Sequence, residues 1–149
     1  MLITVLTQLY ERDLNKLKSE IEQYRSDEEL WKTAGDISNS GGNLALHLCG
    51  NLRHFIGFVL GGSGYVRDRE LEFSDTGIGR QELQTRIDAT LDEVTASLAK
   101  LTTKDLEKEY PIVVFEAPMT TGYFITHLAT HFSYHLGQIN YHRRLISAA

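Results

Sequence analysis

The stretch that decides the fold is residues 121–146, TGYFITHLATHFSYHLGQINYHRRLI. It contains no proline and no acidic residue, and its only fixed charges are two arginines near its end. We therefore expect a last helix that begins near Thr120 or Thr121 and continues to about Ile146. Because a helix with so few charges is normally buried on more than one side, this helix is expected to pack inside a larger assembly of helices.

Three further stretches have the features of long helices. Residues 2–26 and 80–101 repeat apolar residues every three or four positions, with charges between them. The remaining stretch follows candidate N-caps at 38–40 and stops at the glycines of 61–64. Four long helices predict an all-α four-helix bundle, and the length of 149 residues predicts a single domain over residues 1–149.

Two connections are long enough to cross from one end of such a bundle to the other. Residues 65–79 are predicted to form a loop with alternating charges at 67–70. Between Pro111 and Pro118, the apolar run at 112–115 is rich in β-branched residues. This run predicts a short β-rich segment, a small hairpin, before the last helix.

Composition restricts the classes of partner. The formal net charge is −5 and the pI is about 5.6, so we expect no nucleic-acid partner. The single cysteine, Cys49, excludes an internal disulfide and a cysteine-based zinc cluster. Residues 2–9 are apolar but lack a basic flank, so they are read as neither a signal peptide nor a membrane span. We expect a cytoplasmic protein without a membrane partner.

Charge is distributed unevenly among the four helices. Residues 39–64 contain one charged residue, Arg53, and residues 119–149 contain no acidic residue. Each helix of a four-helix bundle has an outward face, so something should cover these two helices. A homodimer that packs them against their symmetry mates explains the pattern, and a monomer with an apolar surface is the alternative.

All six histidines lie on the two charge-poor helices, at His47, His54, His127, His131, His135 and His142. Three of those on the last helix are four residues apart, so they share one face. The two on the earlier helix are about 10 Å apart along the axis, so only one of them can reach a given ion.

These histidines have two interpretations. A buried histidine commonly serves as a core residue whose ring nitrogens are hydrogen-bonded. Two histidines four residues apart can instead bind one metal ion, and a third from a facing helix completes a three-histidine site with open positions. Spacing does not choose between the pair His127 and His131 and the pair His131 and His135.

The segment from His127 to Ile139, HLATHFSYHLGQI, closely resembles the C-terminal signature of the DinB superfamily. In these damage-inducible and bacillithiol-transferase-like bundles, two histidines precede a Gly-Gln-Ile run. Residues 46–53, LHLCGNLR, and 67–73, RDRELEF, look like an uncharacterised branch of that superfamily. The resemblance covers essentially the whole chain.

The resemblance implies a bundle with up-down-down-up topology, usually dimeric, that holds a divalent metal ion on three histidines. Carried over to this sequence, the ligands are His47, His131 and His135. His127 matches a position that is often histidine without being a ligand, and His54 matches no functional position, like His142. Zinc or nickel is the expected ion, with iron or manganese as further candidates.

The surroundings of these histidines carry further expectations. No acid lies on either ligand helix, so the ion would be held by three neutral imidazoles. The motif is neither the His-Glu-x-x-His of zincin proteases nor the Glu-x-x-His of di-iron bundles. Asn51, Tyr134 and Gln138 are candidate supporting groups, for which an interhelical hydrogen bond, dimer packing and a helix-to-helix contact are the simpler roles. Gly137 permits close approach of another helix.

Two groups outside the ligand set are expected to be structural. Cys49 points away from the ion and is expected to be a small core residue. The run from Arg67 to Glu72 is expected to be a salt-bridged loop at the edge of the bundle, or else to order the entrance to the site.

Two classes of function follow. The first is a metal-dependent enzyme, either an S-transferase that uses a low-molecular-weight thiol or a metal-hydroxide hydrolase acting on another small molecule. The second is a non-catalytic, dimeric metal-binding or stress-response protein. No catalytic residue is assigned beyond the metal ligands.

Overall fold

The computed structural model describes residues 1–148. This part of the chain is helical, with no β-sheet. Its elements, in order, are α1 (Leu2–Glu22), the 3-10 helix η1 (Glu28–Trp31), α2 (Gly41–Leu52), the π-helix η2 (Arg53–Phe58), α3 (Arg69–Ser74), α4 (Arg80–Ala99), α5 (Thr103–Glu107) and α6 (Thr121–Ala148). None of these helices is long and apolar enough to cross a membrane.

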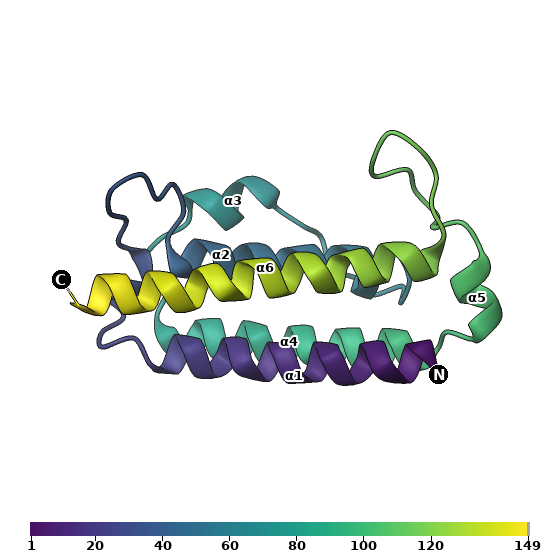
Figure 1. The fold of residues 1–149 in the computed structure, drawn as a ribbon, viewed down its shortest axis with the longest axis horizontal. Coiled ribbons are helices and arrows are strands. Elements are labelled where there is room, and N and C mark those ends of the chain that lie inside the picture. Colours follow the sequence, from purple (N-terminus) through teal and green to yellow (C-terminus); the bar gives the residue numbers. More distant parts are fainter. Residues whose placement is uncertain (149) are drawn as a thin grey trace.

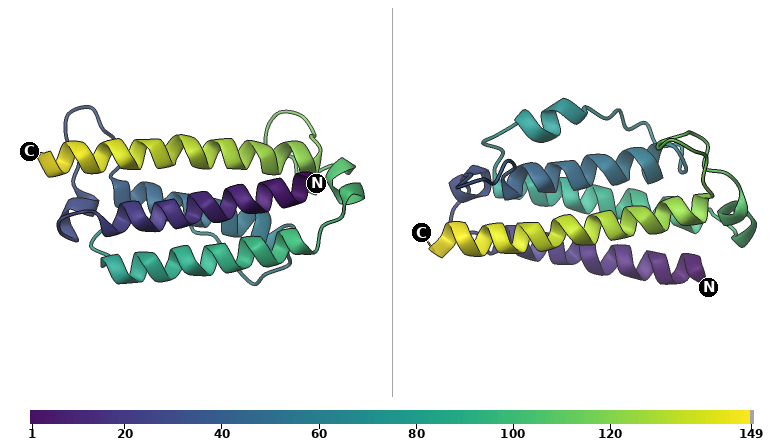
Figure 2. Two further views of the ribbon diagram at one scale, coloured as in Figure 1. Left: turned by 60° about the horizontal axis from the view of Figure 1, so that its bottom comes forward. Right: turned by 45° about the horizontal axis from the view of Figure 1, so that its top comes forward.

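The four long helices lie side by side, with α2 and α6 packed over α1 and α4 (Figure 1). Hydrogen bonds connect α1 and α6 at two places, one nearer the start of both helices and one near the end of both. Tyr10 donates to the carbonyl of Ile125, and Arg143 donates to the carboxylate of Glu20. These two helices therefore run in the same direction, and α2 and α4 run the opposite way (Figures 1 and 2).

The predicted apolar stripes form the core between these helices. On α1, the stripe residues Leu6, Tyr10, Leu14, Leu17 and Ile21 are at most 2% exposed. Their spacing of three or four residues keeps them on one face, and most charged residues of α1 are exposed. Asp13 and Glu20 are instead buried beside the stripe. Helix α4 packs against α1, and the stripe residues that it buries in the same way are Leu83, Ile87, Val94 and Leu98.

Helix α2 is buried on every side. Ser40 caps it by accepting a hydrogen bond from the backbone of Asn43, as expected from the candidate caps. Every residue of α2 is buried, because the short helix α3 lies over the face that the other long helices leave open (Figure 2). The low charge of α2 is thus explained within the chain, whereas α6 keeps an uncovered charge-poor face.

Two predictions about the connections were wrong. Residues 65–79 are not entirely a loop, because they contain α3. Residues 108–118 form no hairpin, and within the described residues the segment has one isolated bridge, between Glu109 and Thr120. Prolines at 111 and 118 lack the N–H that a ladder requires, and an isolated two-stranded hairpin is marginally stable. Val113 and Phe115 are consequently exposed.

Candidate metal centre

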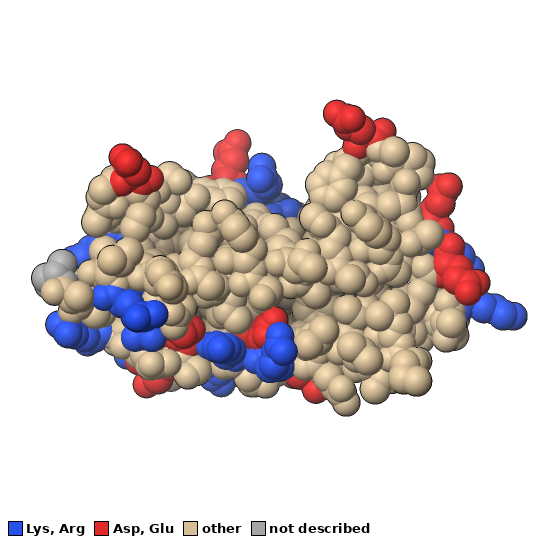
Figure 3. Space-filling view, viewed as in Figure 1, with Lys and Arg blue, Asp and Glu red and all other residues tan. Residues whose placement is uncertain are grey.

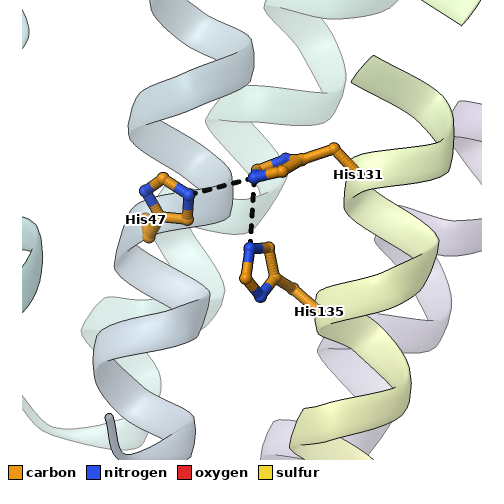
Figure 4. Close-up of side chains that lie close together, drawn as sticks. All are labelled: His47, His131 and His135. Carbon is orange, nitrogen blue, oxygen red and sulfur yellow. Dashed lines mark hydrogen bonds between the residues drawn. The ribbon is translucent and has the colours of Figure 1, made fainter. Parts of the chain in front are cut away.

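Three histidine side chains meet between α2 and α6, as Figure 4 shows. His47 projects from α2, and His131 and His135 project from successive turns of α6. The Nε2 atom of His131 lies 3.2 Å from that of His47 and 3.1 Å from that of His135. The structure therefore brings together the three residues carried over from the resemblance.

In two of these rings, a hydrogen bond at Nδ1 keeps the proton away from the Nε2 atoms that meet between the helices. His47 Nδ1 lies 3.0 Å from a carboxylate oxygen of Glu72, and His135 Nδ1 lies 2.7 Å from Oε1 of Gln138. Both oxygens accept hydrogen bonds, so each Nδ1 carries the proton and donates it. The Nε2 atoms of both rings consequently present lone pairs to the third ring.

The third ring, His131, cannot satisfy both lone pairs. A proton on its Nε2 can point at His47 or at His135, but not well at both. Its own Nδ1 is buried and has no hydrogen-bond partner among residues 1–148. Burial, and then the neighbouring His135 and His47, lower the pKa of His131 to about 4. The ring is therefore neutral near pH 7, as a metal ligand must be.

A divalent cation fits this arrangement. Metal–nitrogen bonds of about 2.0–2.1 Å in a tetrahedral site place two imidazole nitrogens about 3.3 Å apart. The observed separations of 3.1 and 3.2 Å are close to that value, and all three ligand atoms lie within 4.8 Å of one another. A cation at the centre would accept all three lone pairs. Within residues 1–148, no fourth His, Cys, Asp or Glu belongs to this cluster.

Glu72 is the residue of the site that the sequence analysis missed. It lies on α3, is 5% exposed, and accepts hydrogen bonds from His47 and from Arg67. Burial raises the pKa of its carboxyl group, but these hydrogen bonds outweigh burial and the pKa lies below its ordinary value. The salt bridge expected in the run from Arg67 to Glu72 is present, but the run enters α3 and contacts His47 instead of forming a loop at the edge of the bundle. The sequence feature that could have indicated Glu72 is the mixed-charge run at 67–72, which follows a predicted helix with almost no charge.

The candidate supporting groups behave differently from one another. Gln138 orients His135 and makes no helix-to-helix contact through that bond, contrary to expectation. Tyr134 packs its ring beside His135 and is 66% exposed. Asn51 is buried, but its Oδ1 has no partner within the described residues, so the expected interhelical bond to that atom is not found. A side chain at Gly137 would meet no atom within 4 Å.

The other histidines lie outside the cluster. His54 packs between Phe55 and Phe58, and His127 stacks on Phe124. Cys49 is buried, and its burial raises the pKa of the thiol to about 11, which agrees with the expected core role.

His142 lies farther along α6, away from the cluster. Its Nε2 donates to the carbonyl of Lys32, and its Nδ1 accepts from the hydroxyl of Tyr24. Both ring nitrogens are therefore used within the chain.

Three solved bacterial structures share this fold. A conserved protein of Enterococcus faecalis has a TM-score of 0.78 at 14% identity, with 98% of this chain and 97% of that chain covered. A DinB-like protein of Bacillus cereus has a TM-score of 0.75 at 16% identity, and a DinB-like protein of Bacillus subtilis, YjoA, has 0.70 at 18%. Both alignments cover 95% of this chain and 91% of the other.

Sequence comparison assigns the family. No curated protein matches the chain. The family model described as "Protein of unknown function (DUF1572)" matches residues 3–149, which is nearly the whole chain. The DinB-like structures share the fold that the resemblance of residues 127–139 implied. The chain belongs to the DUF1572 family, and its fold is that of DinB-like proteins.

Proposed function

We propose that the protein binds a divalent metal ion on His47, His131 and His135 and is a metal-dependent enzyme acting on a small molecule. The observation that carries the proposal is the convergence of three Nε2 atoms, two of which have their lone pairs fixed by outer hydrogen bonds. Zinc or nickel is the proposed ion, because neutral imidazoles suit both; iron or manganese is the further candidate.

The reaction we propose is thiol S-transfer or hydrolysis. A divalent ion on three neutral imidazoles supplies a Lewis acid that lowers the pKa of a thiol or of water. The chain supplies the orientation of the rings, through Glu72 at His47 and Gln138 at His135. The ring of Phe73 packs against His47 at 4.9 Å and limits the access of water from that side.

A groove beside the centre supports a small-molecule substrate. It has a volume of about 640 Å³ and runs between residues 36–39 and α6. His135 and Gln138 line it together with the apolar side chains of Ile37 and Leu145. A molecule in this groove would lie against one of the three proposed ligands, which a purely structural ion does not require.

The proposed assembly is a homodimer through α6. Its outward face carries large side chains that are 59–66% exposed, namely Tyr123, Tyr134, Tyr141 and Leu145. Figure 3 shows that the surface over the middle of α6 has few charges. The directions of the four long helices support the up-down-down-up topology that the resemblance implies.

The first test is the metal content of untagged protein, wild type beside His135→Ala, by elemental analysis. His54→Ala is the matched control, because His54 lies outside the cluster. We expect near-stoichiometric zinc or nickel in the wild type and in His54→Ala, and its loss in His135→Ala with the helical circular dichroism retained. No metal in any of the three, even after incubation with excess ion, would overturn the proposal.

The second test separates the enzyme from a non-catalytic binder. Metal-loaded wild type is assayed for thiol transfer and for ester or amide hydrolysis, with His135→Ala as the control. Turnover that depends on the ion supports the enzyme. A stoichiometric ion without turnover in these assays would favour the alternative, a dimeric metal-binding or stress-response protein.

A further inference from the structure

We propose that Glu72 is a positioning residue of the metal centre, which holds the proton of His47 on Nδ1 and thereby sets the affinity of the site for its ion. The inference deepens the proposed function and rests on it. Histidines that ligate metals commonly donate their other N–H to a carboxylate, which fixes the ring and makes it a stronger donor.

The contact between Glu72 and His47 is buried and direct. The carboxylate Oε1 lies 3.0 Å from Nδ1, and the two side chains are 6% and 8% exposed. The carboxylate of Glu72 also accepts both hydrogen bonds from Arg67, and a carboxylate oxygen accepts rather than donates, so the proton of this contact lies on Nδ1 of the ring. Nε2 of His47 is then unprotonated and directed at His131.

Arg67 holds the carboxylate in the orientation that this contact needs. Its Nε donates to Oε2 of Glu72 at 2.8 Å, and its terminal nitrogen donates to Oε1 at 2.9 Å. A bidentate guanidinium fixes the plane of a carboxylate as well as its position. The guanidinium also balances the negative charge that would otherwise be buried without compensation.

The backbone of α2 is shaped to receive this carboxylate. A Cβ on Gly50 would lie 2.0 Å from Oε2 of Glu72, so any larger residue would displace the side chain. One turn before His47, Asn43 donates to the backbone carbonyls of Glu72 and Asp75 at 3.0 and 2.8 Å. Three separate features, a glycine, an amide and an arginine, therefore place one carboxylate against one histidine.

If the contact between Glu72 and His47 only attached α3 to α2, its loss would leave zinc affinity unchanged. If Glu72 positions His47, its loss weakens zinc binding, so the test measures zinc affinity. Zinc affinity is measured by competition with a fluorescent chelator in wild type and in Glu72→Gln, which keeps the size of the side chain. We expect a loss of about 10–100-fold in affinity. The matched control is Glu93→Gln, because Glu93 forms a similar bidentate pair with Arg53.

The control should change zinc affinity by less than twofold, since Glu93 contacts none of the three histidines. A Glu72→Gln variant with the affinity of the wild type would overturn the inference while leaving the proposed function intact. A wild type that binds no zinc would overturn both, so the two failures are distinguishable.

A second measurement needs no variant. In metal-free wild type, two-bond nitrogen–proton correlations report which nitrogen of each imidazole carries the proton. We expect His47 to carry it on Nδ1, and Glu72→Gln, where it folds, to show a mixture of the two forms. A proton on Nε2 of His47 in the wild type would overturn the inference without reference to any metal measurement.

Discussion

At the residue scale, the position of one proton separates a structural histidine from a candidate ligand. His142 donates from Nε2 to a backbone carbonyl and accepts at Nδ1 from Tyr24, so it has no lone pair left for an ion. His47 and His135 donate outward from Nδ1 and keep Nε2 free. The same side chain on the same two helices therefore has opposite roles, which the hydrogen-bond partners decide.

The stability of the metal-free protein should fall as the pH drops below about 6.5, in part because of His142. Burial lowers the pKa of His142 below its ordinary value, although the bond to Lys32 partly opposes this. The unfolded chain therefore binds a proton at a higher pH than the folded chain does. Stability is lost as the pH falls through this window, and the loss stops below the folded pKa.

This dependence is measured by chemical denaturation of chelator-treated protein between pH 8 and pH 5. His142→Asn should show a shallower fall over the same range, because it has no imidazole at this position to titrate. It should also be less stable at pH 8 by about 1–3 kcal/mol, since a buried hydroxyl loses its partner. Equal slopes for the two proteins would contradict the assignment.

At the scale of single elements, α2 and α6 are both poor in charge for different reasons. Helix α3 covers α2, so its composition reflects burial within one chain. No element of the described chain covers the outward face of α6, where Tyr134 and Tyr141 stand on either side of Gly137. A second copy of α6 packed on this face would bury the tyrosines, and the glycine would allow the helices to approach closely.

This face predicts a dimer that sedimentation can detect. We expect wild-type protein to sediment as a dimer at tens of micromolar, and Tyr141→Glu to weaken the dimer at least tenfold, because it places a charge in the apolar contact. Val66→Glu is the control, since Val66 is 86% exposed on the loop before α3. A monomeric wild type would remove the proposed dimer and leave the metal centre unaffected.

At the scale of the whole molecule, the apolar core is expected to fold without the candidate metal centre. The buried apolar side chains form one cluster that includes residues from all four long helices. The three histidines lie at the edge of this cluster, between two of those helices. We expect a core of this extent to fold the chain, so a bound ion would add stability to a bundle that already exists.

Removal of metal should therefore lower stability without unfolding the protein. At a free zinc concentration 100 times its dissociation constant, binding adds about 2.7 kcal/mol to the free energy of unfolding. We expect the melting temperature to rise on zinc addition and to return on chelation, with the far-ultraviolet circular dichroism unchanged at 25 °C. His131→Ala should show no rise. Loss of helical signal on chelation would show that the bundle needs its ion.

Much of the helical architecture follows from local pattern. The stripes of α1 and α4, the serine cap of α2 and the start of α6 are set by residues within one or two turns of each other. The hairpin predicted from the apolar run at 112–115 was wrong, because local pattern does not show whether a strand has a partner to pair with.

Predicting the candidate metal centre required both the sequence and the tertiary structure. Sequence placed the histidines on two helix faces, and the resemblance to the DinB superfamily selected His47, His131 and His135 where spacing left two pairs open. Glu72 is 25 residues from His47, and only the path of the chain after η2 brings it back over α2. Helical periodicity is fixed by near neighbours, whereas contacts between distant segments depend on how the connections run, so tertiary structure alone decided which carboxylate meets the site.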